Sequence, residues 1–458
     1  MIIVPDGIGI KNYLYSDFLQ KLLDEQISVD VISKLDIDFV KELSSSALFN
    51  VHALPVYKEG ALEVCLREIA KYARLNYFTR KLKNKTILNS RSLASSFQKK
   101  TFLAVCRLFG SALSWFGYDA ICAIDKWYAS LLSKRDLTKF EELFSRLKPD
   151  AIISTHQRPI ENIPLYEQAR RMRVTRTCVI YSWDNVVRAS LNTRSDYYFL
   201  WSDFMRKQMQ LFYPEIKAES LVVTGTPQFS FYFNPIYQWS KDDFYKKFNI
   251  PHGKQFVIFS GSDQKTSPFD PALLQDVYDA ISQIPVDVRP ALIFRRTPAD
   301  FSSRYDEILK RHADIISIDP LWINKGSTWN TAIPTKDDIR NIVGLIQHCS
   351  LIINVGSTMA IDGATHHKPC IYLAYSPSNS PFFDYEAVIH GEDHFKILRD
   401  IDAVGYVRKH EQLQPLIEGI IRYPEKYATQ KDLMFERVTD NIVAEAADNL
   451  IAMLKKHA

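Results

Sequence analysis

The sequence predicts an α/β protein built from two doubly wound, Rossmann-like domains, and three observations support this fold class. The chain has 458 residues, which is too long for one ordinary hydrophobic core and suits two domains of roughly 200 residues each. Short apolar runs alternate with helical patterns, as in a parallel sheet that is covered on both faces. The alternation breaks near residue 240 and then begins again.

The first predicted domain spans residues 1–240. Its expected strands are continuous apolar runs, and amphipathic patterns between them indicate helices. Strands are predicted at 1–5, 29–33, 150–155, 178–182, 197–201 and 220–225, and helices at 13–25, 165–172 and 202–212. A basic, aromatic and largely helical insertion is predicted at about 61–145.

The second predicted domain spans residues 241–429, after an aromatic stretch that breaks the first rhythm. Strands are predicted at 255–260, 291–295, 315–319, 351–355 and 370–374, and helices at 241–248, 271–283, 303–312, 336–348 and 358–366. Residues 430–458 carry a closing amphipathic helix (430–456) that is expected to pack back across a neighbouring domain. Doubly wound sheets bind ligands outside the carboxyl ends of their strands, so we expect these ends to border an intervening cleft.

The composition is that of an ordinary globular protein, with 46% hydrophobic and 24% charged residues. Its six cysteines are scattered without a C-x-x-C pair, which is typical of reduced, buried thiols. The N-terminus lacks the charged start and the cleavage site of a signal peptide, and no run of about 18 apolar residues occurs. We therefore expect a cytoplasmic protein.

The segment 71–100 is strongly basic, because it contains nine Lys/Arg and no Asp/Glu. Aromatic and aliphatic residues are interleaved with these charges. Such a segment can contact anionic lipid head groups on the inner face of the cytoplasmic membrane or a phosphate-bearing acceptor, or it can be a solvated helix face. Nucleic acid is not an expected partner, because no recognised nucleic-acid-binding module accompanies the basic run.

The most informative segment is L-I-I-N-V-G-S-T-M-A-I-D-G-A at 351–364. Its apolar strand ends at Gly356, and Ser357 and Thr358 stand where a helix begins. Backbone amides and the helix dipole can hold a diphosphate at such a point. Asp362 lies one turn further along, where it can bind a ribose or sugar hydroxyl. The alternative is plain capping of the helix by Ser357.

Two other strand ends of the second domain carry groups that suit anions. The loop after the first strand contains Ser260, Gly261 and Ser262, which offer amides and hydroxyls. The run F-R-R-T-P at 294–298 delivers Arg295, whose forked guanidinium suits phosphate oxygens. Three strand ends of one sheet therefore favour anion binding.

Several runs together resemble one protein family. These runs are P-D-G-I-G-I-K-N (5–12), T-H-Q-R-P (155–159), S-W-D-N (182–185), V-T-G-T-P-Q-F (223–229) and I-N-V-G-S-T-M-A-I-D-G-A-T-H-H-K-P-C-I (353–371). In order and spacing they resemble the GT-B-fold glycosyltransferases of bacterial surface-polysaccharide biosynthesis, a group distantly similar to the CDP-glycerol glycerophosphotransferases of teichoic acid synthesis. The resemblance covers most of the chain.

This resemblance implies a nucleotide-sugar donor bound by the second domain and a glycan or lipid-linked acceptor on the side of the first. It implies that Ser357, Thr358 and Asp362 grip the donor, with Arg295 and Ser262 in support. The family often has R-x-H-P where this chain has R-R-T-P (295–298), so one histidine of the family pattern is missing.

Three first-domain residues are candidates for the general base that an inverting transferase needs, namely Asp6, His156 and Asp184. Each follows a predicted strand. Asp6 precedes a glycine-rich turn, His156 can act as a base at neutral pH, and Asp184 lies beside Trp183, which can stack on a sugar ring. Each can equally be a capping or hydrogen-bonding residue, and the sequence does not choose among them.

No bound metal and no cofactor are expected. The D-x-D matches at 36–38 and 400–402 lack a supporting pattern, and the pair His366-His367 lacks further ligands at zinc spacing. The leading hypothesis is therefore metal-independent sugar transfer to a glycan or lipid-linked acceptor. Polyol-phosphate transfer from a cytidine diphosphate donor, nucleotide-sugar 2-epimerisation and a catalytically inactive sugar-nucleotide-binding assembly subunit are the alternatives, with S-W-D-N arguing against the epimerase.

Overall fold

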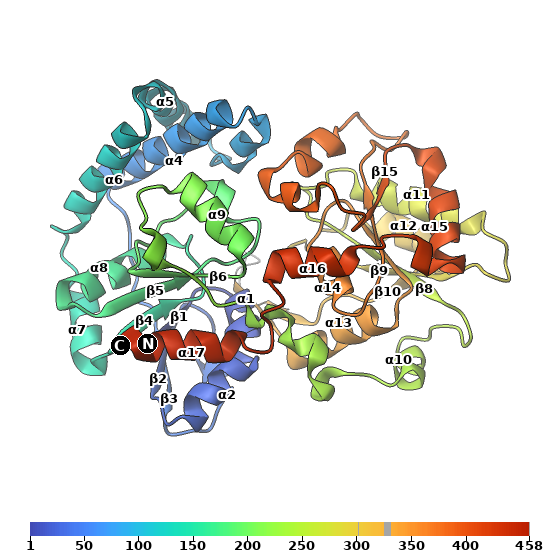
Figure 1. Cartoon of the computed structure of the whole chain (residues 1–458), viewed down its shortest axis with the longest axis horizontal. Coiled ribbons are helices and arrows are strands. Elements are labelled where there is room, and N and C mark those ends of the chain that lie inside the picture. The colour runs from blue at the N-terminus through green and yellow to red at the C-terminus, as the bar shows by residue number, and fades with distance from the viewer. Residues whose placement is uncertain (301, 325–330, 458) are drawn as a thin grey trace. The chain divides into compact units, whose positions relative to one another are not determined.

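The computed structural model describes residues 1–300, 302–324 and 331–457. The chain divides into two compact units, each with its own parallel sheet (Figure 1). The first unit comprises Met1–Pro227, Glu392–His394 and Ile442–Ala458, and the second comprises Gln228–Gly391 and Phe395–Asn441. The predicted α/β fold class, with two Rossmann-like sheets, is confirmed. The predicted cleft stays a prediction.

The sheet of the first unit has seven parallel strands in the order β3-β2-β1-β4-β5-β6-β7. The strands are β1 (Ile2–Val4), β2 (Val29–Ser33), β3 (Phe49–Ala53), β4 (Ala151–Ser154), β5 (Thr175–Val179), β6 (Tyr197–Leu200) and β7 (Leu221–Val223). The order reverses between β1 and β4, which makes this pair the topological switch point of the sheet. The sequence analysis missed β3, because this edge strand alternates buried and exposed residues and lacks a continuous apolar run.

Helices cover this sheet. They are α1 (Gly7–Gly9), η1 (Ile10–Leu14), α2 (Asp17–Asp24), α3 (Ile37–Lys41), α7 (Thr138–Leu147), η4 (Ile160–Asn162), α8 (Ile163–Met172), η5 (Val186–Arg188), α9 (Asp203–Phe212) and η6 (Ala218–Ser220). The helix predicted at 13–25 begins later, at Asp17, because Ser16 caps it by accepting a hydrogen bond from the amide of Phe18 at 3.4 Å.

The region between β3 and α7 forms a helical insertion, at the top of Figure 1. Its helices are α4 (Ala61–Lys81), η2 (Lys85–Ser90), α5 (Phe97–Leu113), η3 (Ser114–Phe116) and α6 (Tyr118–Leu132). Helix α4 packs against both α5 and α6. Gly110 permits the close approach, since a Cβ at this position would lie 2.9 Å from the carbonyl oxygen of Ile69. In the described ranges, no helix combines the length and the apolar character that crossing a membrane requires.

The sheet of the second unit has six parallel strands in the order β10-β9-β8-β13-β14-β15. These strands are β8 (Phe256–Ser260), β9 (Ala291–Arg295), β10 (Ile316–Ser317), β13 (Leu351–Asn354), β14 (Cys370–Leu373) and β15 (Gly405–Val407). A separate antiparallel pair joins β11 (Trp322–Asn324) to β12 (Ala332–Pro334). The order reverses between β8 and β13. The short edge strand β15 was missed, because three residues give no usable periodicity.

The helical elements of the second unit are η7 (Pro227–Phe233), η8 (Pro235–Tyr237), α10 (Lys241–Lys247), α11 (Asp270–Ser282), α12 (Asp306–Arg311), α13 (Lys336–His348), α14 (Met359–Ala364), η10 (Glu386–His390), η11 (Asp393–Leu398), η12 (His410–Gln412), α15 (Leu413–Arg422), η13 (Pro424–Lys426) and α16 (Lys431–Thr439). The aromatic stretch before residue 240 joins this unit rather than the first. Its Phe229 packs edge-on against Phe435, with ring centroids 5.5 Å apart.

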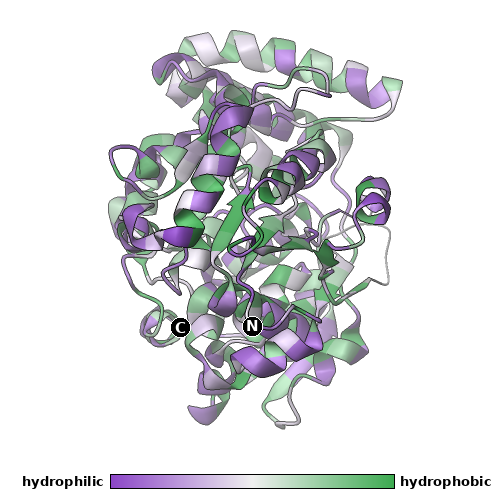
Figure 2. Cartoon of the chain, turned by 90° about the vertical axis from the view of Figure 1, so that its right-hand side faces the viewer, coloured by the Kyte–Doolittle hydropathy of each residue, from purple (hydrophilic) through white to green (hydrophobic). Residues whose placement is uncertain are grey.

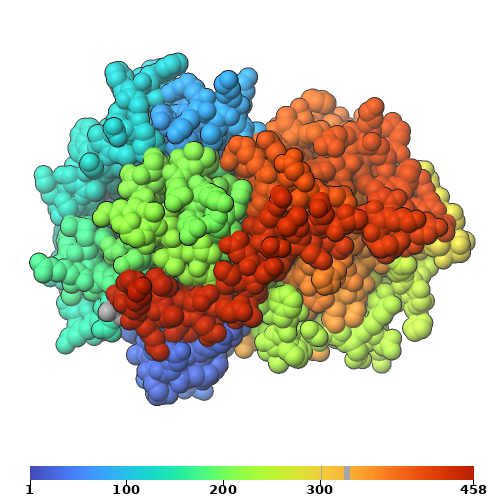
Figure 3. Space-filling model, viewed as in Figure 1, coloured from blue at the N-terminus to red at the C-terminus, as the bar shows by residue number. Residues whose placement is uncertain are grey.

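The prediction of one closing helix at 430–456 is wrong, because two helices occupy this region. Helix α16 ends where Asp440 and Asn441 adopt left-handed backbone angles, with φ of 51° and 57°. The chain then returns to the first unit as α17 (Ala446–His457), which packs on α2. Figure 3 shows α17 lying along the surface of this unit, beside the N-terminal segments.

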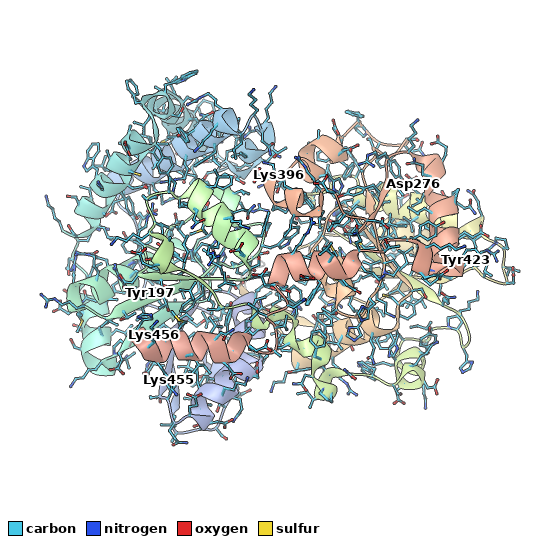
Figure 4. All side chains as sticks on the ribbon, viewed as in Figure 1. Tyr197, Asp276, Lys396, Tyr423, Lys455 and Lys456 are labelled. Carbon is cyan, nitrogen blue, oxygen red and sulfur yellow. The ribbon has the colours of Figure 1, made fainter. Side chains whose placement is uncertain are left out.

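Apolar and polar contacts hold α17 in the first unit. Leu450 and Ile451 are buried, and Lys21 pairs with Asp448 at 2.9 Å. At the other end of the helix, the ring of His457 stacks on Tyr197, with centroids 4.0 Å apart. Figure 4 labels Tyr197 close to the end of this helix. The final helix is therefore part of the first unit, although it follows the second in the sequence.

We expect Leu450→Ala to lower the free energy of unfolding of the first unit by about 2–5 kcal/mol, because it leaves a cavity beneath α17. Lys456→Ala, which changes an exposed side chain of the same helix, should alter it by less than about 0.5 kcal/mol. Urea unfolding of both variants checks this. Equal stability of the two variants would mean that α17 contributes nothing to this core.

Candidate active site and donor-side loops

Two of the predicted first-domain residues meet at the switch point of the first sheet. Asp6 follows β1 and His156 follows β4, and these strands are direct neighbours. Both side chains are buried, with 3% and 5% of their surface exposed. Asp6 Oδ2 lies 2.7 Å from His156 Nδ1. The structure therefore brings together two candidates that are 150 residues apart in the sequence.

The turn after β1 orients the carboxylate of Asp6. Its Oδ1 accepts a hydrogen bond from the amide of Gly9 at 3.0 Å, so that Asp6 caps α1. A Cβ at residue 9 would lie 2.6 Å from Thr155 Oγ1, which explains the glycine. Burial acts to raise the pKa of Asp6, but the hydrogen bonds from His156 and Gly9 outweigh it and lower this pKa below its usual value. Asp6 is thus an ionised carboxylate at neutral pH.

The hydrogen bonds of His156 define its tautomer. Arg158 Nε donates to His156 Nε2 at 3.0 Å, so the ring proton lies on Nδ1 and is donated to Asp6. The ring also stacks on Tyr181, with centroids 4.0 Å apart. Burial lowers the pKa of His156, and although Asp6 opposes this effect the net direction is downward. The result is a neutral imidazole whose basic nitrogen faces a cation.

The third candidate, Asp184, is held differently. Its carboxylate forms an ion pair with Arg188 and accepts a hydrogen bond from Asn185 Nδ2 at 2.8 Å. Burial acts to raise the pKa of Asp184, but the charge of Arg188 dominates and holds this pKa far below its usual value. A carboxylate with so low a pKa is a weak base. Of the three candidates, His156 is the neutral group, and its Nε2 accepts a hydrogen bond from Arg158.

Arg158 is a site residue that the sequence analysis missed. It is half-buried, and the charges of both Asp6 and Asp184 act on its guanidinium. Its signal was present in the run T-H-Q-R-P, where it stands two residues after His156. A cation beside the imidazole gives this strand end a positive group that can meet an anionic substrate.

In the second unit, the two predicted loops also meet at a switch point. The loop with Ser260, Gly261 and Ser262 leaves β8, and the loop with Gly356, Ser357 and Thr358 leaves β13. Because β8 and β13 are paired neighbours, both loops lie at the carboxyl edge where such a sheet binds its ligand.

Four amides of these loops are already bonded within the protein. Those of Gly356 and Ser357 donate to Asn354 Oδ1 at 2.8 and 2.7 Å. The amide of Ser262 donates to Asp270 Oδ2 at 3.0 Å, and that of Gly261 to a β9 carbonyl at 2.9 Å. The expectation that these amides are open to a diphosphate therefore does not describe this conformation. Asn354 and Asp270, which shape the two loops, were the overlooked signals.

The helix after the second loop is shorter than predicted. It is α14, Met359–Ala364, and Ser357 Oγ accepts a hydrogen bond from the amide of Met359 at 3.2 Å. The N-cap position itself is Thr358, whose side chain makes no capping hydrogen bond. Asp362 is nearly buried on α14, where it accepts a hydrogen bond from Tyr232 OH at 2.9 Å. Its carboxylate is thus fixed at the second switch point, in contact with a phenol.

Gly356 is required by packing. Its φ is +129°, and a Cβ there would approach Ile389 Cγ2 to 2.8 Å and Phe395 Cζ to 3.1 Å. The same position lies 3.5 Å from His390 Cε1, which the sequence analysis did not single out. Burial lowers the pKa of His390 to about 4. A neutral imidazole therefore backs the loop.

The interpretation of Arg295 as a donor contact is not supported by its position. Its guanidinium is buried and forms an ion pair with Asp338, with Nη2 2.9 and 3.0 Å from the two carboxylate oxygens. Asp338 also accepts hydrogen bonds from the amide of Leu321 and the indole of Trp322, each at 2.8 Å. This cluster joins β9 to α13, and it commits Arg295 to the core.

A cavity of about 470 Å³ lies elsewhere in the first unit, beneath the helical insertion. Arg74 and Arg194 line it, and both pair with Asp125, at 2.7 and 2.8 Å. Neither Asp6 nor His156 lines this cavity, so it is separate from the candidate site at the strand ends. Among the residues that the structure describes, no group of three His, Cys, Asp or Glu side chains could hold a metal ion.

No family model and no curated protein matches the chain. The two parallel-sheet units define a GT-B-like fold. Solved structures with this fold include the UDP-GlcNAc 2-epimerase of Methanocaldococcus jannaschii, which is 11% identical over 99% of both chains with a TM-score of 0.56. A putative UDP-N-acetylglucosamine 2-epimerase of Listeria monocytogenes is 10% identical over 100% of this chain and 95% of its own, also with a TM-score of 0.56.

A third similar structure is the UDP-GlcNAc 2-epimerase of Neisseria meningitidis bound to UDP-GlcNAc. It is 10% identical over 99% of both chains, with a TM-score of 0.51. These likenesses extend over nearly the whole chain, and at such low identity they concern the fold.

We expect Arg295→Ala to lower the free energy of unfolding of the second unit by about 3–5 kcal/mol, because it leaves Asp338 as an unpaired buried charge. Its neighbour Arg296 provides the matched control. The ion-pair distances of Arg296 are 3.5 and 3.7 Å, to exposed carboxylates, so Arg296→Ala should cost less than about 1 kcal/mol. Chemical unfolding checks both variants. If the Arg295→Ala protein is as stable as the parent, Arg295 is not needed for the fold and becomes a candidate donor contact again.

Proposed function

We propose that the protein is a glycosyltransferase that moves a sugar from a nucleotide-sugar donor to a glycan or lipid-linked acceptor in surface-polysaccharide (O-antigen or capsule) biosynthesis. The observation that carries this proposal is the Asp6–His156 pair at the switch point of the first sheet. A neutral histidine held by a carboxylate is the arrangement that removes a proton from an attacking hydroxyl. The sequence resemblance to the polysaccharide glycosyltransferases supports the same reaction.

In the proposed reaction, the acceptor hydroxyl takes the place of Arg158 at His156 Nε2. His156 removes its proton while the hydroxyl oxygen forms a bond to the anomeric carbon of the donor sugar. The bond from this carbon to the diphosphate breaks, and the nucleoside diphosphate leaves with the electron pair. Asp6 keeps the ring in the required tautomer and stabilises the imidazolium that forms. Displaced from the ring, Arg158 remains near enough to contact an anionic group.

On the donor side, we propose that the nucleotide binds at the carboxyl edge of β8 and β13. Since several loop amides are bonded to Asn354 and Asp270, the proposed contacts come from the hydroxyls of Ser262, Ser357 and Thr358. Asp362, which is oriented by Tyr232, is the proposed partner of a donor hydroxyl.

One experiment tests the reaction class. The purified protein is first screened by thermal shift with nucleotides and nucleotide sugars, because a specific ligand stabilises the folded state. Each stabilising nucleotide sugar is then incubated with the protein and followed by NMR. Release of a nucleoside diphosphate supports glycosyl transfer. Inversion at C2 without release of diphosphate would instead identify an epimerase, and consumption of a CDP-polyol with release of CMP would identify a phosphotransferase.

We expect His156→Gln to lower kcat by about 10²–10⁴-fold, because the general base is lost, with little change in donor affinity. His52 offers a matched control in the same sheet, since its Nε2 lies 2.8 Å from Asp30 Oδ1 on β2. His52→Gln should retain full activity. Nucleoside diphosphate release measures kcat, and calorimetry measures donor affinity. Comparable activity of the two variants would remove His156 from the mechanism.

The pH profile provides a second check on His156. Its pKa is lowered in the folded protein, so the imidazole should stay neutral as the pH falls through its usual value of about 6.5. The value of kcat/KM should therefore hold at this pH and fall only in more acidic buffer, where His156 becomes protonated. Asp6→Asn removes a charge that raises the pKa, so its acid limb should move to still lower pH while the maximal rate falls. An acid limb at or above about pH 6.5 in the parent contradicts the assignment.

A further inference from the structure

Helix α5 is apolar on two sides, and the protein covers only one of them. Leu103, Cys106 and Gly110 are buried on the face toward α4. Phe102, Val105 and Phe109 recur at helical spacing on the other side, where they are exposed. A helix with apolar residues on both sides is normally covered on both. The exposed side of α5 is therefore a candidate contact surface.

The exposed apolar surface continues past the end of α5 into η3. Phe97 is 84% exposed at the start of the helix, and Trp115 and Phe116 are 75% and 77% exposed at its end. We define the apolar face by the following seven side chains: Phe97, Phe102, Val105, Leu108, Phe109, Trp115 and Phe116. An exposed set of seven large apolar side chains along α5 and η3 is typical of an interaction surface. Figure 2 shows hydrophobic and hydrophilic residues side by side along the helices at the top of the view, where the insertion lies.

Along the sequence, the charge near the apolar face is positive up to Tyr118, and the exposed Asp119 follows on α6. From Ile69 to Tyr118 the sequence contains ten Lys/Arg and no Asp/Glu. Lys99 and Lys100 are exposed in the first turn of α5 itself. Most basic residues of 71–100 lie on α4, on η2, in the loops beside them and at the start of α5, but Arg74 is buried and pairs with Asp125.

We propose that the apolar face docks on the surface of a membrane that contains anionic lipids. Phenylalanine, leucine and tryptophan side chains enter the boundary between head groups and acyl chains, and the surrounding lysines and arginines contact lipid phosphates. A second copy of the chain is a poorer occupant, because symmetric pairing would bring two segments of the same charge together. The inference does not rest on the proposed function, since lipid binding can be measured without donor or acceptor.

The sequence pointed to the basic segment 71–100 as the part that contacts lipid. The structure moves the proposed contact to a neighbouring segment. The residues that enter the lipid come from α5 and η3, at 97–116, while the basic segment supplies the charges around them. A protein held in this way lies on the membrane and does not span it. It would meet a lipid-linked molecule at the surface where such a molecule is anchored.

The full-length protein is tested by flotation with vesicles of phosphatidylcholine alone or with about 30% phosphatidylglycerol. We expect binding to the anionic vesicles that weakens as salt is raised. The double variant Phe109→Ser, Phe116→Ser should bind at least about tenfold more weakly, because two apolar side chains are lost from the contact. The matched control is Val286→Ser, Phe382→Ser, which alters two exposed apolar residues of the second unit and should bind like the parent.

Charge is tested separately with Lys99→Glu, Lys100→Glu, which should reduce the preference for anionic over neutral vesicles. Melting curves check that each variant is folded, as expected for exposed positions. The proposal is overturned if the parent does not float with anionic vesicles, or if the Phe109→Ser, Phe116→Ser variant floats equally well. It is also overturned if sedimentation shows a dimer that this variant dissociates, with no lipid binding by the parent.

Discussion

The parallel pairing of β1 with β4 is the constraint on which the candidate site depends. Its register places Ile2 opposite Ile153 and Ile3 opposite Ser154. Asp6 and His156 then leave neighbouring strands at the same edge, close enough for a hydrogen bond of 2.7 Å. A shift of one residue would turn the side chains of one strand to the other face of the sheet. Burial of the apolar side chains of β1 and β4 therefore fixes the register. This register in turn places Asp6 and His156, which lie just beyond the ends of the two strands.

Burial then determines what this polar pair can do. A carboxylate and an imidazole removed from water influence each other more strongly than they would at the surface. The carboxylate stays ionised because it accepts hydrogen bonds, while the imidazole stays neutral because burial and a nearby arginine disfavour its charged form. The surface pair His52–Asp30 has a similar distance but lies only half-buried in the sheet, toward an edge strand.

The second sheet has the same topology but uses its polar residues differently. Asn354 and Asp270 bond the amides of the two loops, and Asp338 holds Arg295 within the core. These bonds occupy the amides of Gly356, Ser357 and Ser262, so these amides are not open to an anion in this conformation. A short helix that follows a strand is therefore no guarantee of open amides, because an asparagine at the strand end can occupy them.

The sequence alone determined the fold class, since continuous apolar strands that alternate with amphipathic helices favour a doubly wound parallel sheet. It also identified Asp6 and His156 separately, because both follow strands and both can titrate. Only the tertiary structure decided that these two meet and that Asp184 is held by Arg188. Contacts such as these depend on strand order and helix breaks, which local patterns do not encode. The same limit explains why Arg295 looked like an anion ligand and why α16 and α17 looked like one helix: a buried ion pair and a left-handed turn are settled by long-range packing.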